Sequence, residues 1–79
     1  MKIPRNLSGR RLAAVLCRGW GYRVVHQEGS HIILQTDTPT HQRLPVPDHS
    51  PLRVGTLAAI LRLVATHHGV DRETILRGL

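Results

Sequence analysis

The sequence is poor in aromatic residues, in cysteine and in long apolar runs. It has no Phe, one Trp, one Tyr and one Cys. The lone Cys17 excludes a disulfide framework within the chain, as in proteins of a reducing compartment. Two aromatic rings are too few for a platform that stacks successive bases of single-stranded nucleic acid. The longest apolar runs, Leu12–Cys17 and Leu57–Leu61, fall far short of the ~20 residues that span a bilayer. We therefore expect a cytoplasmic protein without membrane insertion or secretion.

Acidic residues are also scarce, and the charge is strongly positive. Eleven Lys and Arg residues against five Asp and Glu give a formal net charge of +6. A balance of this kind favours a polyanionic partner, with nucleic acid as the first candidate. The alternatives are charge that only aids solubility, or an interaction domain that binds an acidic protein through Arg10, Arg11 and Arg53. The chain of 79 residues, 41% of them apolar, is expected to form one domain over residues 1–79 with a thin aliphatic core.

The spacing of apolar residues predicts an α+β fold in the order helix, strand, strand, strand, helix, helix. The expected elements are a helix over Gly9–Arg18, strands over Tyr22–Gln27, His31–Thr36 and His41–Val46, a helix marked by Leu57, Ile60, Leu61 and Val64, and a short helix after Asp71. Ser8 and Asp71 are the expected N-caps of the first and last helices. Pro45 cannot donate a hydrogen bond, which assigns the third strand to an edge of the sheet.

The first two strands are close enough to form a hairpin. If Glu28 and Gly29 are the two loop residues, His26 pairs with His31 and Val25 with Ile32. One face of the hairpin then carries Val25, Ile32 and Leu34, and the other carries Tyr22, Val24, His26, His31, Ile33 and Gln35. This register predicts two imidazoles side by side in solvent.

An exposed pair of histidines can supply acid and base, because a neutral imidazole accepts a proton while a protonated one donates. Cleavage of RNA needs a base that removes the proton of a 2′-hydroxyl, so that its oxygen attacks the adjacent phosphorus. The alternative is that these histidines are polar surface residues. A zinc site has little support, since no histidines are spaced as ligands on one helix and Cys17 has no partner.

Several short motifs resemble those of the HicA family of toxin–antitoxin systems. They are Ile3-Pro4-Arg5, Leu7-Ser8-Gly9, Gly21-Tyr22, Gln27-Glu28-Gly29-Ser30-His31, Leu44-Pro45-Val46-Pro47-Asp48-His49, Val54-Gly55-Thr56-Leu57 and Gly69-Val70 with Glu73. Together they cover nearly the whole chain in the family's order.

The resemblance implies a fold like the double-stranded RNA-binding domain, with helices on one face of a three-stranded antiparallel sheet. It implies a ribosome-independent, metal-independent mRNA interferase that needs no cofactor, with His31 as the catalytic residue. His26, Ser30 and His49 are the candidate auxiliary residues. The expected RNA contacts are Lys2, Arg5, Arg10, Arg11, Arg23, Arg43 and Arg53. The expected partners are mRNA and a HicB-like antitoxin, with the oligomeric state left open.

The chain departs from the family at three positions. His26, Glu28 and Ile33 stand where family members often present Arg or Lys, which predicts weaker phosphate attraction. A folded but catalytically degraded toxin is therefore one alternative. A second is a DNA-binding helix-turn-helix formed by residues 56–66 and 71–79, which would offer Arg72, Thr74 and Arg77 to bases.

Overall fold

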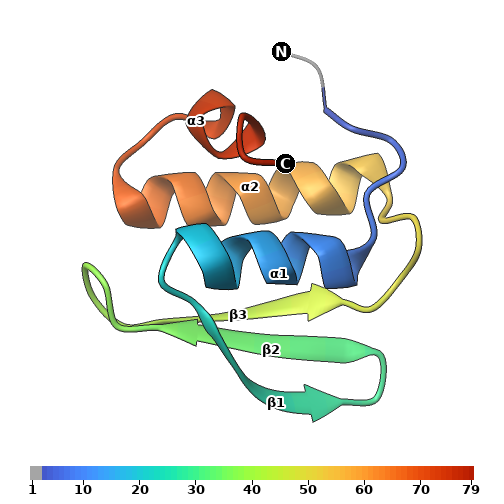
Figure 1. Cartoon of the computed structure of the whole chain (residues 1–79), viewed down its shortest axis with the longest axis horizontal. Coiled ribbons are helices and arrows are strands. Elements are labelled where there is room, and N and C mark those ends of the chain that lie inside the picture. Colours follow the sequence, from blue (N-terminus) through green and yellow to red (C-terminus); the bar gives the residue numbers. More distant parts are fainter. Residues whose placement is uncertain (1–2) are drawn as a thin grey trace.

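Three strands and three helices follow one another in the order that the sequence predicts. The computed structural model describes residues 3–79. Its elements are α1 (Gly9–Gly19), β1 (Arg23–Glu28), β2 (His31–Thr36), β3 (Gln42–Pro47), α2 (Val54–His68) and α3 (Arg72–Leu76) (Figure 1). The strands form an antiparallel sheet in the order β1-β2-β3, so β2 is central and β3 lies at an edge. The predicted order of elements and the edge position of the Pro45 strand are confirmed.

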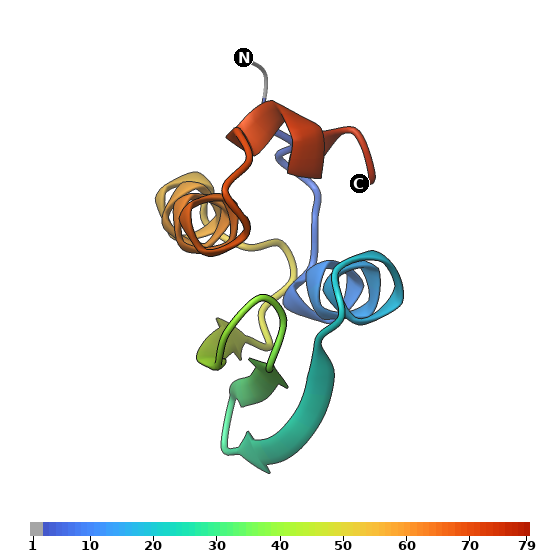
Figure 2. The same ribbon diagram turned by 90° about the vertical axis from the view of Figure 1, so that its left-hand side faces the viewer.

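The long helices lie on one side of the sheet, and the other side is open (Figure 2). α1 packs across all three strands, α2 packs against β3, and α3 packs against α2. The fully buried side chains between these layers are Leu12, Leu16, Leu34, Thr36, Leu44, Val46, Leu57, Leu61, Val64 and Ile75. Each large aliphatic side chain contributes about 1.5–3 kcal/mol when it leaves water. The α+β fold with an open three-stranded sheet, expected from the sequence, is confirmed.

The helix ends follow the capping chemistry of the sequence. Ser8 Oγ accepts a hydrogen bond from the Arg11 N–H (3.1 Å) at the start of α1. Asp71 Oδ1 accepts one from the Thr74 N–H (2.9 Å) at the start of α3. Both bonds satisfy amide groups that have no partner within the helix. The predicted N-caps are therefore confirmed.

The predicted turn of the β1–β2 hairpin is displaced by one residue, which shifts the pairing by two. The loop residues are Gly29 and Ser30, and Glu28, not His26, is the partner of His31. Gly29 has a φ of 58° while Ser30 has a negative φ, which is the pattern of a turn with glycine at its first loop position. A glycine serves either position of a two-residue turn. All six residues of β1 are exposed, so no buried side chain fixed the register in the sequence.

A β-bulge at Val25 changes the faces that the hairpin presents. The pairing shifts between Val24 and His26, which leaves Val25 as the extra residue and 41% exposed, not in the core. Val24 lies opposite the buried Leu34, on the helix side of the sheet rather than on the open side. Tyr22, predicted on the open face, is buried at 4% exposure. After the bulge the alternation resumes, so His26 and His31 still share the open face.

The start of α1 lies against the end of β3, and Gly9 makes this contact sterically allowed. A Cβ at Gly9 would overlap the carbonyl oxygen of Pro47. The Gly9 N–H donates to the carbonyl oxygen of His49 (2.9 Å), and the Leu52 N–H donates to the carbonyl oxygen of Leu7 (2.8 Å). These contacts hold the loop after β3 against the N-terminus of α1.

Gly9→Ala is expected to lower the free energy of unfolding by about 1–3 kcal/mol, because backbone has to move to admit the methyl group. Gly19→Ala is the matched control, since nothing lies within 4 Å of a Cβ built there. That control should be neutral or stabilising by up to about 1 kcal/mol, because alanine favours the helix over glycine. Urea denaturation of both variants measures the difference. Equal stability of the two variants would contradict the close approach at Gly9.

A polar network joins the other end of the sheet to the end of α2. The buried Tyr22 hydroxyl donates to Gln42 Oε1, and His68 Nε2–H donates to the Tyr22 oxygen (3.2 Å). His67 Nε2–H donates to the carbonyl oxygen of Thr40 (2.9 Å). The Trp20 ring meets the His68 ring edge to face at 5.2 Å between centroids. Burial raises the pKa of Tyr22 to about 12, and burial, followed by the charge of His67, lowers the pKa of His68.

The lowered pKa of His68 predicts that stability falls on acidification. Below about pH 6.5 the unfolded chain takes up a proton at His68 that the folded protein resists, so unfolding becomes more favourable. The loss begins at about pH 6.5 and is complete below the lowered pKa of folded His68. Thermal denaturation of the wild type and His68→Gln between about pH 7.5 and pH 5 measures it. A variant as pH-dependent as the wild type would contradict this origin.

Candidate functional site

The open face of the sheet is built from three rows of residues paired across the strands. The rows are Glu28–His31–Pro47, His26–Ile33–Pro45 and Arg23–Gln35–Arg43. Directly paired residues project to the same face, and the alternate residues Ile32, Leu34 and Thr36 of β2 are buried beneath the helices. The sequence prediction that His31 lies on the open face therefore holds, although its partner differs.

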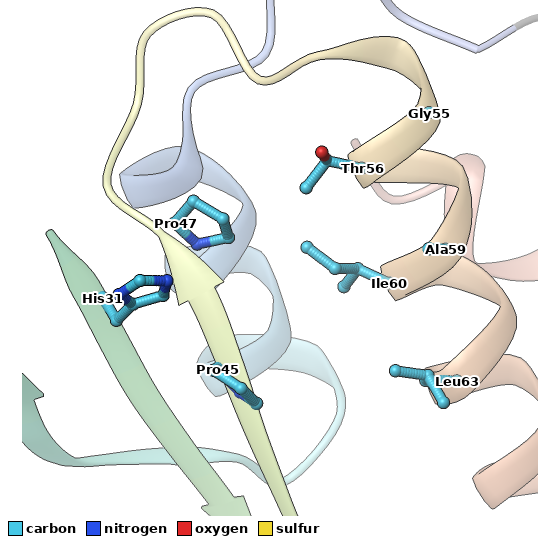
Figure 3. A pocket seen from close by; sticks show the side chains of 8 residues that line it. All are labelled: His31, Pro45, Pro47, Gly55, Thr56, Ala59, Ile60 and Leu63. Carbon is cyan, nitrogen blue, oxygen red and sulfur yellow. The ribbon is translucent and has the colours of Figure 1, made fainter.

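His31 is exposed at the start of β2, beside the turn, and borders a cavity. The cavity has a volume of about 430 Å³ and is lined by His31, Pro45, Pro47, Gly55, Thr56, Ala59, Ile60 and Leu63. Figure 3 shows the α2 side chains Thr56, Ile60 and Leu63 on one side of it, and His31 with the two proline rings of β3 on the other. The lining is mostly apolar, with the Thr56 hydroxyl among its few polar groups. One side of the imidazole is therefore open to a molecule that enters from solvent.

Glu28 and His26 lie next to His31 on the open face. Glu28 is the direct partner of His31, and His26 lies one row further along β1. The His26 Nε2 and Glu28 Oε2 atoms are 3.7 Å apart, with side chains 56% and 77% exposed. Two imidazoles and one carboxylate thus occupy adjacent positions, where the sequence register predicted two imidazoles alone. Glu28 was missed as a site residue because the predicted turn placed it in the loop.

The turn that precedes His31 is held from the far side by the loop after β3. The Asp48 N–H donates to the carbonyl oxygen of Ser30 (2.6 Å). The Asp48 carboxylate accepts hydrogen bonds from Arg10 Nε (3.0 Å) and Nη2 (3.1 Å). Ser30 and His49 are both exposed, and the His49 backbone bonds to the start of α1 rather than folding over the open face. His49 does not line the cavity beside His31.

The predicted RNA-binding residues do not form one patch. Arg23 and Arg43 flank Gln35 in one row of the open face. Arg10 is tied to Asp48 on α1, and Arg53 precedes the first residue of α2. Arg5 and Arg11 lie together in a separate groove, which Leu79 also lines. Lys2 lies outside the described residues.

An acidic side chain lies beside the Arg23 row. Arg23 Nη2 and Asp37 Oδ2 are 3.2 Å apart, and His41 Nδ1 and Asp37 Oδ1 are 3.1 Å apart. The hydrogen bond from His41, followed by the one from Arg23, lowers the pKa of Asp37. Part of the positive charge of Arg23 is therefore offset, whereas no ion pair of Arg43 is found within residues 3–79.

No group of three His, Cys, Asp or Glu side chains in residues 3–79 is arranged to hold a metal ion. Over the same residues, no helix has the length and apolarity needed to cross a membrane. Cys17 is partly buried in α1, and burial raises the pKa of its thiol.

Comparison with known proteins identifies the family. Residues 9–65 match the family model described as the HicA toxin of bacterial toxin-antitoxin. The chain belongs to the HicA toxin family. The matched segment runs from the start of α1 almost to the end of α2, and it contains His26, Glu28 and His31. Neither a curated protein nor a solved structure matches this HicA family member.

Membership of the HicA family confirms the resemblance first seen in the short motifs. A toxin of this kind belongs to a toxin–antitoxin system, so the family implies an antitoxin partner in general terms. The His31 row and the cavity both lie within the matched segment, as does the loop that carries Asp48. The candidate site of this HicA toxin is therefore built from the part of the chain that defines the family.

Proposed function

We propose that this HicA family member is a metal-independent endoribonuclease that cleaves mRNA, with His31 as the general base. The observation that carries the proposal is the position of His31. Its imidazole is exposed on the open face, beside a cavity and within the family segment. A neutral imidazole is suited to removing the proton of a ribose 2′-hydroxyl.

The attack itself needs little beyond the base. Once the 2′-oxygen loses its proton it attacks the adjacent phosphorus, and the chain breaks at the bond to the 5′-oxygen. The products are a 2′,3′-cyclic phosphate and a free 5′-hydroxyl. General acid-base help contributes about 10²- to 10⁴-fold, so a single histidine supports a slow enzyme. Gly29 and Ser30 of the turn are both exposed, which leaves room for the sugar-phosphate backbone beside His31.

The Arg23 and Arg43 row is the proposed contact for the RNA backbone away from the cleaved bond. Both guanidinium groups lie on the open face, two rows from His31. Bidentate guanidinium contacts suit phosphate oxygens. His26, Glu28 and Ile33 lie between or beside these rows, so the phosphates nearest His31 meet little positive charge. This arrangement supports weak, salt-sensitive binding of RNA with the Arg row as its main anchor.

The proposed antitoxin is a HicB-like protein that covers the open face. His31 is exposed on that face and borders the cavity between β3 and α2. A partner that occupies this surface would block RNA without changing the fold. A basic toxin also favours an acidic antitoxin through electrostatic attraction.

A DNA-binding helix-turn-helix receives less support from the geometry. Its second helix would be α3, which has five residues and is therefore only about 8 Å long. Ile75 of this helix is fully buried against the core. A helix this short offers few side chains to a major groove.

His31→Gln is expected to lower the rate of RNA cleavage by about 10²- to 10⁴-fold while leaving the fold intact, because the side chain is exposed and only the base is lost. The measurement is cleavage of a labelled transcript by purified protein, with detection of the 2′,3′-cyclic phosphate end. Growth arrest on expression is the matching test in cells.

His41→Gln is the control for the His31 variant. His41 is also an exposed histidine, but it lies in the loop before β3 at the opposite end of the sheet. The His41→Gln variant should cleave RNA at the wild-type rate. The nuclease proposal is wrong if the wild type and His31→Gln cleave RNA at equal rates. It is also wrong if neither protein cleaves RNA while the wild type binds duplex DNA and slows its migration in a gel.

Arg43→Gln is expected to weaken RNA binding irrespective of sequence and to reduce the slope of log affinity against log salt by about 0.7. Arg62→Gln is the control, since Arg62 is exposed on α2. Filter binding of single-stranded RNA to the His31→Gln protein at several salt concentrations measures both effects. An unchanged slope for Arg43→Gln would place the RNA elsewhere.

A further inference from the structure

His26 and His31 are diagonal neighbours across the β1–β2 hairpin, not direct partners. Glu28 lies opposite His31, and Ile33 lies opposite His26. Directly paired side chains on one face have Cβ atoms about 4.5–5.5 Å apart, whereas diagonal neighbours are about 7–8 Å apart. The two imidazoles therefore stand further apart on the open face than a direct pair would, with Glu28 at the corner between them.

This diagonal spacing fits the geometry of phosphoryl transfer better than a direct pair. The attacking oxygen and the leaving oxygen lie on opposite sides of the phosphorus, roughly in line. A base and an acid must each reach one of these oxygens at about 2.6–3.2 Å. The two ring nitrogens consequently have to stand apart by the oxygen–oxygen distance plus a hydrogen bond at each end. Rings in direct contact would leave no room for a phosphate between them.

We propose that His26 is the general acid of the reaction, a role that rests on the proposed function of His31 as its base. His31 takes the proton of the 2′-hydroxyl, and the 2′-oxygen forms a bond to phosphorus. The bond from phosphorus to the 5′-oxygen breaks, and that oxygen takes a proton from the His26 imidazolium. The cyclic phosphate and the 5′-hydroxyl leave, and solvent exchange returns the proton from His31 to His26.

Glu28 is the positioning residue for His26. Its carboxylate lies 3.7 Å from His26 Nε2, where it can orient the ring and pair with the protonated imidazole. The other charged or titratable groups that face His26 are Arg23, one row away on β1, and His31, diagonally across on β2. Arg23 is itself paired with Asp37, which offsets its repulsion of a charged His26. Ile33, the direct partner of His26, brings no charge to the site.

The acid role makes a prediction that depends on the leaving group. An RNA phosphodiester loses a poorly stabilised alkoxide and needs a proton from the acid. A uridine 3′-(4-nitrophenyl phosphate) loses nitrophenolate, which leaves without protonation. The His26→Gln variant should therefore cleave a dinucleotide about 10²- to 10⁴-fold more slowly than the wild type. Its rate on the nitrophenyl ester should fall by less than about 10-fold. His31→Gln should lose activity on both substrates, because both need the base.

The two proposals fail in different ways in this experiment. If His31→Gln keeps wild-type activity on both substrates, the proposed function falls. The acid role alone is wrong if His31→Gln is inactive but His26→Gln cleaves the dinucleotide at the wild-type rate. It is also wrong if His31→Gln is inactive and His26→Gln loses the same factor in rate on both substrates. His26 is 56% exposed, so its replacement should leave the fold unchanged, and circular dichroism of each variant checks this.

Glu28→Gln tests the positioning role by separate measurement of kcat and KM. If the carboxylate orients the His26 ring, kcat on the dinucleotide should fall by about 10-fold with KM close to the wild-type value. The nitrophenyl rate should stay close to that of the wild type, because that substrate needs no acid. Glu73→Gln, an exposed acid on α3, is the control and should leave both constants unchanged. A wild-type kcat on the dinucleotide, or an equal loss on both substrates, would overturn this role.

Discussion

The close contact between the start of α1 and the end of β3 is the constraint on which the candidate site depends. Gly9 admits the Pro47 carbonyl group where any side chain would overlap it. The same junction supplies the hydrogen bond from the Asp48 N–H to Ser30 and the ion pair of Asp48 with Arg10. One end of the sheet is thereby fixed to the helical layer, and the turn that carries His31 is fixed with it. The site is exposed, yet the turn beside it is bonded to the loop after β3, and that loop is paired with α1.

Charge is distributed unevenly over the open face, in contrast to the simple basic surface that the net charge of +6 suggests. One end carries Arg23 and Arg43, and the other carries Glu28 with two histidines. In the proposed function, attraction for a phosphate chain and acid–base chemistry belong to different rows of one sheet. The non-basic residues His26, Glu28 and Ile33 all lie on this face, where they limit its positive charge.

The elements of the fold could be predicted from the sequence, because each depends on short-range patterns. Ser8 and Asp71 mark helix starts through bonds to amides three residues away, and Leu57, Ile60, Leu61 and Val64 recur at helical spacing. The exposed position of His31 was also predictable, since Ile32 and Leu34 alternate with it and face the core. The hairpin register was not predictable, because β1 is an edge strand with no buried face and its glycine suits either turn position.

By itself, then, the sequence determined the order of helices and strands, the family and the exposed position of His31. These depend on local hydrogen bonding and on periodic burial, which neighbouring residues encode. Only the tertiary structure decided that Glu28, not His26, lies opposite His31, that Tyr22 is buried against His68, and that the arginines divide among several surfaces. Those outcomes depend on a bulge at Val25 and on contacts between segments far apart in the chain, and no short stretch of residues carries that information.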